Sequence, residues 1–278
     1  MSFQLPTFDE LPPVEGMPQG CAWGIFDKDG RNDIFGTLNL LTPEVVKAAT
    51  AEVRKGISVS LNWSLESIKN PEFFRKSLSH KVMKLEDGET EWHDRGCIVG
   101  RGVLIDYKSY ADHKGIQYSP FSSHRITPSD IETVAAYQGT KFQPGDILII
   151  RFGVTEVLGK LNAEEQAAAM STHHACGLEG TEEMARWIWN NHFAAVASDN
   201  VAVEAMPPML DGKEQPLTQL VLHQWCLSLF GLPLGELWYL KELAEKCRDE
   251  RKWTFLLTSA PLNVPGAVGS PANALAII

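Results

Sequence analysis

Two residues in the second half of the chain have the chemistry of metal ligands. His223 and Glu236 lie in the stretch LHQWCLSLFGLPLGELWYLKELAEK, thirteen residues apart. An imidazole and a carboxylate suit zinc or manganese, which accept mixed nitrogen and oxygen ligands. On one straight helix their side chains would point roughly 220° apart, but Gly231-Leu232-Pro233 predicts a turn between them. A helix, this turn and a short extended LPLGE segment would bring the two side chains together.

Spacing alone also allows structural roles for both residues. His223 would then be a hydrogen-bonded core histidine, and Glu236 would cap a following helix at LWYLKELAEK.

Two further candidates for a functional site are His173-His174 and Asp199. Adjacent histidines on a helix point about 100° apart and do not readily bind one ion. Asp199 ends an apolar strand, where active sites of α/β folds gather, although a turn or cap role is the alternative.

Composition narrows the possible functions. The net charge of −10 disfavours binding to nucleic acid, because the basic residues are scattered. The chain has no G-x-S-x-G elbow and no phosphate-binding glycine motif, which disfavours nucleotide chemistry. The five cysteines are widely spaced, as expected of thiols in a reducing compartment. With no secretory signal and no apolar run of membrane-spanning length, we expect a cytoplasmic protein without membrane contacts.

The elements that would position these side chains alternate between helices and strands. Helices are predicted after Thr42 and Thr127, each a capping residue followed by proline. Further helices are predicted at 179–192, burying Met184, Trp187 and Ile188, and at 217–231. Strands are predicted at 57–63, 97–107, 145–153, 193–200 and 253–262. The interleaving predicts a mixed α/β fold, with an irregular arm at 1–37 and one domain over 38–278.

Five blocks of the sequence together resemble the cyclase family of metal-dependent hydrolases, which includes kynurenine formamidase and isatin hydrolase. The blocks are WGIFDKDGRNDIFGTLNLLTPEVV (23–46), RGCIVGRGVLIDY (95–107), FQPGDILIIRFG (142–153), GLEGTEEMARWIWNNHFAAVASDNVAVEAMP (177–207) and LHQWCLSLFGLPLGELWYLKELA (222–244). The resemblance covers most of the chain and is closest to larger, fungal-type members. It implies a single mixed-sheet domain, a small-molecule substrate and a homo-oligomer.

The resemblance also implies a reaction. Members of this family hydrolyse amide, lactam or lactone-like bonds with water activated by a divalent metal. Their ligands come from an upstream H-x-G-T-H-x-D-x-P-x-H segment, or a Q-W-D-G-x-x-H variant, and from a downstream His and Glu. That downstream pair corresponds to His223 and Glu236. The resemblance thus implies an arylformamidase-type hydrolase with zinc or manganese, in tryptophan catabolism or secondary metabolism.

The upstream motif has no match in this sequence. FFRKSLSHKVMKLEDGE (73–89) resembles the segment before it and EWHDRGCIVGRGVLIDY (91–107) the segment after it, so the motif is missing near 89–91. We therefore assign no catalytic residue. The gap has three explanations: an incomplete gene model or splice form, a true pseudoenzyme, or a site rebuilt by His93 and Asp94. We expect either a hydrolase of low or absent activity or a non-catalytic member that keeps the fold for assembly or ligand binding.

Overall fold

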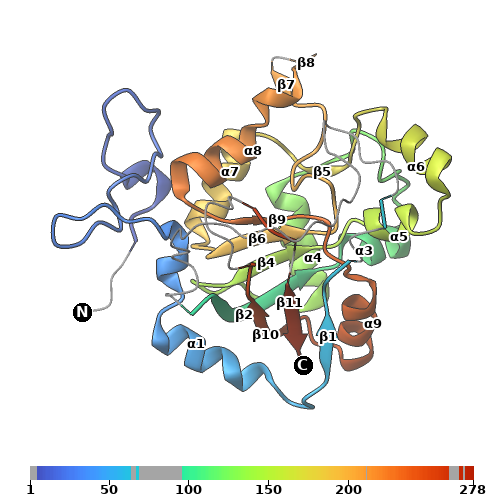
Figure 1. Ribbon diagram of the computed structural model, residues 1–278, viewed down its shortest axis with the longest axis horizontal. Helices are drawn as coiled ribbons and strands as arrows, with labels where there is room; N and C mark the ends of the chain where they lie inside the picture. The colour runs from blue at the N-terminus through green and yellow to red at the C-terminus, as the bar shows by residue number, and fades with distance from the viewer. Residues whose placement is uncertain (1–4, 64–66, 69–95, 211, 263–268, 272) are drawn as a thin grey trace, which may run out of the picture.

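A mixed β-sheet runs through the centre of the structure, with helices around it (Figure 1). The computed structural model describes residues 5–63, 67–68, 96–210, 212–262, 269–271 and 273–278. Among these residues, seven strands form one sheet in the order β1-β11-β10-β2-β4-β6-β9. Strands β2, β4, β6 and β9 are parallel, whereas β10, β11 and β1 add antiparallel pairs. The predicted mixed-sheet α/β fold is confirmed.

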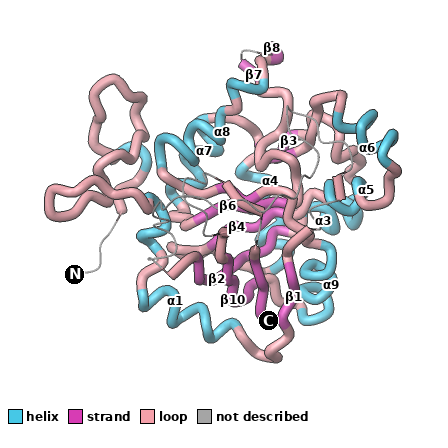
Figure 2. The backbone as a smooth tube through the Cα atoms, in the orientation of Figure 1, coloured by secondary structure: helices cyan, strands magenta, loops and turns pink. Residues whose placement is uncertain are grey.

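The strands and helices are short, and loops join them over much of the surface (Figure 2). The strands of the large sheet are β1 (Ser58–Ser60), β2 (Ile98–Ile105), β4 (Ile147–Ile150), β6 (Ala195–Ser198), β9 (Leu234–Gly235), β10 (Thr254–Ser259) and β11 (Ala274–Ile277). Two small sheets pair β3 (Arg125–Ile126) with β5 (Gly177–Leu178) and β7 (Met209–Leu210) with β8 (Lys213–Glu214). The helices are α1 (Pro43–Ala49), α3 (Tyr107–Lys114), α4 (Pro128–Gln138), α5 (Val154–Leu158), α6 (Ala163–Met170), α7 (Glu182–Asn190), α8 (Val221–His223) and α9 (Lys241–Glu250). There are also 3-10 helices at Phe8–Glu10, Gly36–Leu40, Thr50–Glu52 and Leu217–Gln219, and a π-helix at Gln224–Phe230.

Helix starts follow the capping residues that the sequence predicts. Thr42 accepts a hydrogen bond from the backbone N–H of Val45 at the start of α1. Thr127 and Asp130 form a reciprocal capping box at the start of α4, which satisfies backbone donors that have no acceptor inside the helix. Gly139 ends α4 in the left-handed conformation at φ 67°, which glycine adopts without steric cost.

The sheet separates two hydrophobic cores, and β4 contributes to both. Leu148 and Ile150 point into the core that α4 and α7 cover, whereas Ile147 and Ile149 point into the core on the side of α9. All four side chains are buried. A strand that is apolar on both faces is expected in the parallel centre of a sheet that is covered on each side.

The N-terminal segment lies at one side of the molecule and has little regular structure between residues 5 and 35 (Figure 1). It is held by buried aromatic and backbone contacts rather than by strand pairing. Phe8 is fully buried against Trp225 and Phe230, and the backbone N–H of Ala22 donates to the carbonyl of Leu229. The irregular character of this arm agrees with the sequence, whereas the proposed division at residues 37 and 38 stays a prediction.

Several local predictions are wrong. The stretch 217–231 is not one α-helix but a 3-10 turn, the short α8 and a π-helix. Trp187 is only half-buried because its indole reaches Glu132 near the surface, and Trp189 fills the core instead. The pair His173-His174 is not helical, because it follows α6 and His173 has φ 54°.

Other predictions concern residues without a described position. The missing segment near 89–91 and its neighbours His93 and Asp94 lie outside the described residues. Among the residues that are described, no helix combines the length and apolar character needed to span a bilayer.

Candidate metal site

Charged side chains follow the carboxyl ends of the four parallel strands. Asp106 follows β2, Arg151 follows β4, Asp199 follows β6 and Glu236 follows β9. Parallel strands end at one edge of a sheet, and α/β folds form their sites at that edge. The strand order therefore places these four residues along one edge of the sheet.

Asp106 and Arg151 form a closed ion-pair network. The Arg151 guanidinium lies 2.6 Å from Asp106 and 2.5 Å from Glu156, and none of the three side chains is more than 14% exposed. Asp106 also accepts from Ser109 N at the start of α3. Arg248 lies 3.4 Å from Asp106, so two cations face the two carboxylates, and the network holds the ends of β2 and β4 together.

Asp199 holds the turn after β4. Its two carboxylate oxygens accept hydrogen bonds of 2.7 Å from the backbone N–H groups of Phe152 and Gly153. The side chain is fully buried, and this burial raises its pKa to about 7 although the two hydrogen bonds act in the opposite direction. The geometry agrees with the turn role that the sequence allowed for Asp199.

His223 and Glu236 lie side by side, as the sequence predicts. His223 is the last residue of α8, and the π-helix that follows ends at Gly231 in the left-handed conformation at φ 62°. The chain then enters β9, where Val196 N donates to the carbonyl of Pro233. The turn leaves Nε2 of His223 3.1 Å from Oε1 of Glu236.

Glu236 is not the helix cap that the structural alternative required. Helix α9 begins at Lys241, with Leu240 at its N-cap position. The residues between them are irregular, with Leu237 at φ 57°, and they lie beside the end of β6, because Leu237 N donates to the carbonyl of Asn200 and Trp238 N to that of Ser198. Glu236 itself accepts from Val203 N at 3.3 Å. Its side chain is therefore free of a capping role in α9 and is directed toward His223.

A third residue, Glu204, was not identified from the sequence. It is fully buried, and Oε1 accepts from both the backbone N–H (2.8 Å) and Nδ1 (2.9 Å) of His223. Oε2 accepts from Val221 N at 2.9 Å. A charged residue inside the apolar run VAVEAM is unusual, because a glutamate is almost never fully buried without a partner, and that signal could have identified it. We call Glu204, His223 and Glu236 the His223 site.

Both ring nitrogens of His223 face a carboxylate. Burial is the largest effect on its pKa and favours the neutral ring, but the hydrogen bonds and charges of Glu204 and Glu236 outweigh it and raise the pKa to about 9. Without another cation, the metal-free ring therefore holds two protons at neutral pH. Chemically, the site holds a positive charge between two carboxylates.

The two possible ligand atoms, Nε2 of His223 and Oε1 of Glu236, are about as far apart as two ligands of one metal ion. A nitrogen and an oxygen bound to one tetrahedral zinc lie roughly 3.3 Å apart, and Nε2 of His223 lies 3.1 Å from Oε1 of Glu236. Glu204 holds the other ring nitrogen, as carboxylates commonly do behind metal-bound histidines. The pair fits two ligand positions. No group of three or more His, Cys, Asp or Glu side chains in the described part of the chain is arranged to hold a metal.

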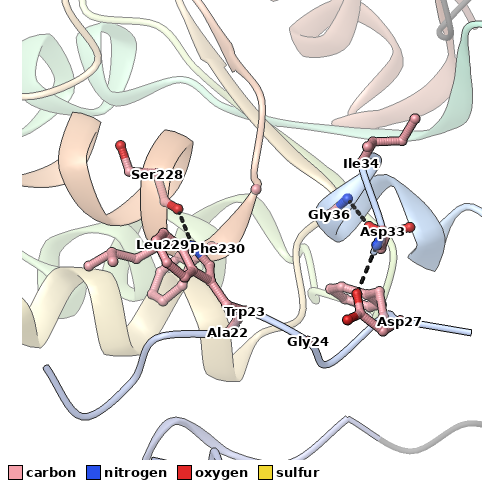
Figure 3. Close-up of a pocket in the computed structure, with 12 residues that line it drawn as sticks. Ala22, Trp23, Gly24, Asp27, Asp33, Ile34, Gly36, Ser228, Leu229 and Phe230 are labelled. Carbon is pink, nitrogen blue, oxygen red and sulfur yellow. Dashed lines mark hydrogen bonds between the residues drawn. The ribbon is translucent and has the colours of Figure 1, made fainter. Parts of the chain in front are cut away.

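A pocket of ≈ 190 Å³ lies elsewhere, between the N-terminal segment and the end of the π-helix (Figure 3). Trp23 lines it and donates from Nε1 to the carbonyl of Ser228, while Asp33 accepts from Gly36 N. Trp225 and Trp187 do not line it; Trp225 is buried in the core and Trp187 is half-buried. None of the three residues of the His223 site lines this pocket.

The fold and the His223 site define a mixed α/β protein with a histidine–carboxylate centre at the carboxyl edge of its parallel strands. A family model described as "Putative cyclase" matches residues 78–205. A solved structure described as a novel cyclase is 25% identical, has a TM-score of 0.72, and is matched over 92% of this chain and 99% of that chain. Both matches support the assignment to the cyclase family that the sequence blocks predict.

Two other solved structures are more distant. Isatin hydrolase A from Labrenzia aggregata, bound to benzyl benzoate, is 17% identical over 65% of this chain and 61% of that chain, with a TM-score of 0.46. A structure described as a potential metal-dependent hydrolase with cyclase activity is 19% identical over 64% of each chain, with a TM-score of 0.39. No curated protein matches the chain.

Proposed function

We propose that this protein is a metal-dependent hydrolase that resembles arylformamidases and cleaves an amide or lactone-like bond of a small molecule. His223 and Glu236 would be two ligands of a zinc or manganese ion. The supporting observation is the 3.1 Å approach of Nε2 of His223 to Oε1 of Glu236, with Glu204 on the far side of the ring. When bound, a divalent metal polarises a carbonyl and activates water near neutral pH.

The residues of the site have distinct tasks under this proposal. His223 supplies Nε2 and Glu236 supplies Oε1, and the hydrogen bond from Val203 N keeps the Glu236 carboxylate in place. Metal binding at neutral pH must displace the proton on Nε2, because the pKa of His223 is raised to about 9. The affinity should therefore increase with pH. We further propose a cytoplasmic homo-oligomer that acts in tryptophan catabolism or secondary metabolism.

The test is a comparison of the wild-type protein with Glu236→Gln after treatment with a chelator. Zinc or manganese should raise the melting temperature of the wild type, because a ligand at 100 times its Kd adds about 2.7 kcal/mol of stability. It should also restore slow hydrolysis of N-formylkynurenine. Glu236→Gln should show neither effect. A wild-type protein whose melting temperature ignores both metals would contradict a metal centre at His223.

A second candidate function is non-catalytic. Within the described ranges no third ligand joins His223 and Glu236, which favours a family member that keeps the fold for assembly or ligand binding. This candidate predicts no metal, no hydrolysis and an unchanged melting temperature in EDTA. Hydrolysis that EDTA abolishes and zinc restores would exclude it.

A further inference from the structure

Glu204 contacts the ring of His223 from the side opposite Glu236. We propose that Glu204 is a positioning residue, which fixes the His223 ring with Nδ1–H toward itself and Nε2 toward Glu236. This inference deepens the proposed function, because it makes Glu204 a determinant of metal affinity at that site. Glu204 would not touch the metal or the substrate.

The backbone around Glu204 is built to accept its carboxylate. Glu204 lies in a bridge with Leu178, and Ala205 N donates to the carbonyl of Leu178 at 2.8 Å. A Cβ atom at Gly180 would lie 2.7 Å from Oε2 of Glu204, and one at Gly177 would lie 2.5 Å from the Glu204 backbone. Side chains at these two positions would push Glu204 away from His223, so the glycines keep its position open.

The same carboxylate caps the helix that carries His223. Val221 and His223 are the first and third residues of α8, where backbone N–H groups have no acceptor inside the helix. Leu220 at the N-cap has no side-chain acceptor, and Glu204 accepts from both donors instead. Glu204 therefore fixes the backbone of His223 together with its ring, which restricts how the ring can turn.

The direction of the ring decides which nitrogen is available. A carboxylate that accepts from Nδ1–H selects the tautomer in which the lone pair is on Nε2. That nitrogen is the one that faces Glu236. A ring turned by about 180° around Cβ–Cγ would direct Nε2 away from Glu236. The carboxylate of Glu204 is fully buried, so losing the Nδ1–H contact would also leave it poorly satisfied.

The experiment compares the wild type with Glu204→Gln and a matched control, Glu236→Gln, which removes the carboxylate on the other side of the same ring. In chelator-treated protein above about pH 10, where the ring is neutral, ¹⁵N spectra of the imidazole report the tautomer. We expect the Nδ1–H form in the wild type and in Glu236→Gln, and a mixture or the Nε2–H form in Glu204→Gln. Zinc titration near neutral pH should show affinity about 10- to 100-fold weaker in Glu204→Gln.

The outcomes separate this inference from the proposed function. Equal zinc affinity in Glu204→Gln and the wild type, or an Nε2–H tautomer in the wild type, would overturn the role of Glu204 while leaving a metal site intact. A wild type that binds no zinc would remove the proposed function, and the tautomer comparison would still decide whether Glu204 orients the ring. If Glu204→Gln does not fold, the wild-type spectrum alone decides between the two tautomers.

Discussion

The two ends of the parallel strands carry differently balanced charges. At the amino end, Arg101 lies 2.8 Å from both Glu52 and Asp146, and Lys252 lies 2.8 Å from Glu52. We call these four residues the amino-edge cluster. Two cations there face two carboxylates. At the other end, the His223 site places two carboxylates around one imidazole.

The difference distinguishes a cluster with balanced charges from a site with an excess of negative charge. The formal charges of the amino-edge cluster sum to zero, so they stabilise the fold without leaving an unpaired charge to attract an ion. The His223 site keeps a formal charge of −1 even with the ring protonated, from two carboxylates and one imidazolium. Arg125 interacts electrostatically with Glu204, but its guanidinium donates to the carbonyl of Pro207. A divalent ion on Nε2 would make the charge of the His223 site more nearly balanced.

The largest effect should come from breaking the amino-edge cluster. Arg101→Ala leaves Asp146, which is almost fully buried, without its cation. We expect a loss of about 3–5 kcal/mol in the free energy of unfolding, measured with urea. Burial already raises the pKa of Asp146 to about 6 despite Arg101, so the loss should be smaller at about pH 5, where the variant's carboxyl is protonated. Zinc affinity per folded molecule should be unchanged.

An intermediate effect should appear as pH dependence at the His223 site. The pKa of His223 is raised from 6.5 to about 9, so its protonation stabilises the folded state fully below pH 6.5 and ceases to do so as pH rises through 9. The contribution is about 3 kcal/mol at most. Urea unfolding of metal-free wild type and His223→Gln should show a stability difference that shrinks over this range. A difference that stays constant with pH would contradict the paired-carboxylate arrangement.

The smallest effect on stability should come from Glu236→Gln. Glu236 is partly exposed and has fewer donors than Glu204, so we expect a loss of about 1 kcal/mol. Glu204→Gln should cost clearly more, because Glu204 is fully buried with three donors. Thermal melting of both variants without metal measures the order. The reverse order would mean that Glu236, and not Glu204, holds His223 in place.

Much of the fold follows from local sequence signals. The threonine caps of α1 and α4 and the apolar strands β2, β4 and β6 lie where the pattern predicts. The convergence of His223 and Glu236 was also predictable, because a glycine and a proline between them require a turn.

Other features depend on contacts between distant segments. Glu204 acquires its role from a helix start seventeen residues further along the chain, which no local pattern encodes. The short irregular run after Glu236 resembled a helix in sequence, yet hydrogen bonds to Ser198 and Asn200 hold it beside the end of β6. Tertiary hydrogen bonds decided both cases over local propensity.

The π-helix Gln224–Phe230 determines how a change of chain length would act on the His223 site. A π-helix holds more residues per turn than an α-helix, so removing one residue from it would restore α-helical winding. Seven π-helical residues and six α-helical residues turn the chain by nearly the same angle, so the two ends would keep about the same relative orientation. His223 lies at one end, and Phe230, which packs on Phe8 of the N-terminal segment, lies at the other. A one-residue deletion there should therefore keep both His223 at its carboxylates and Phe230 in its core.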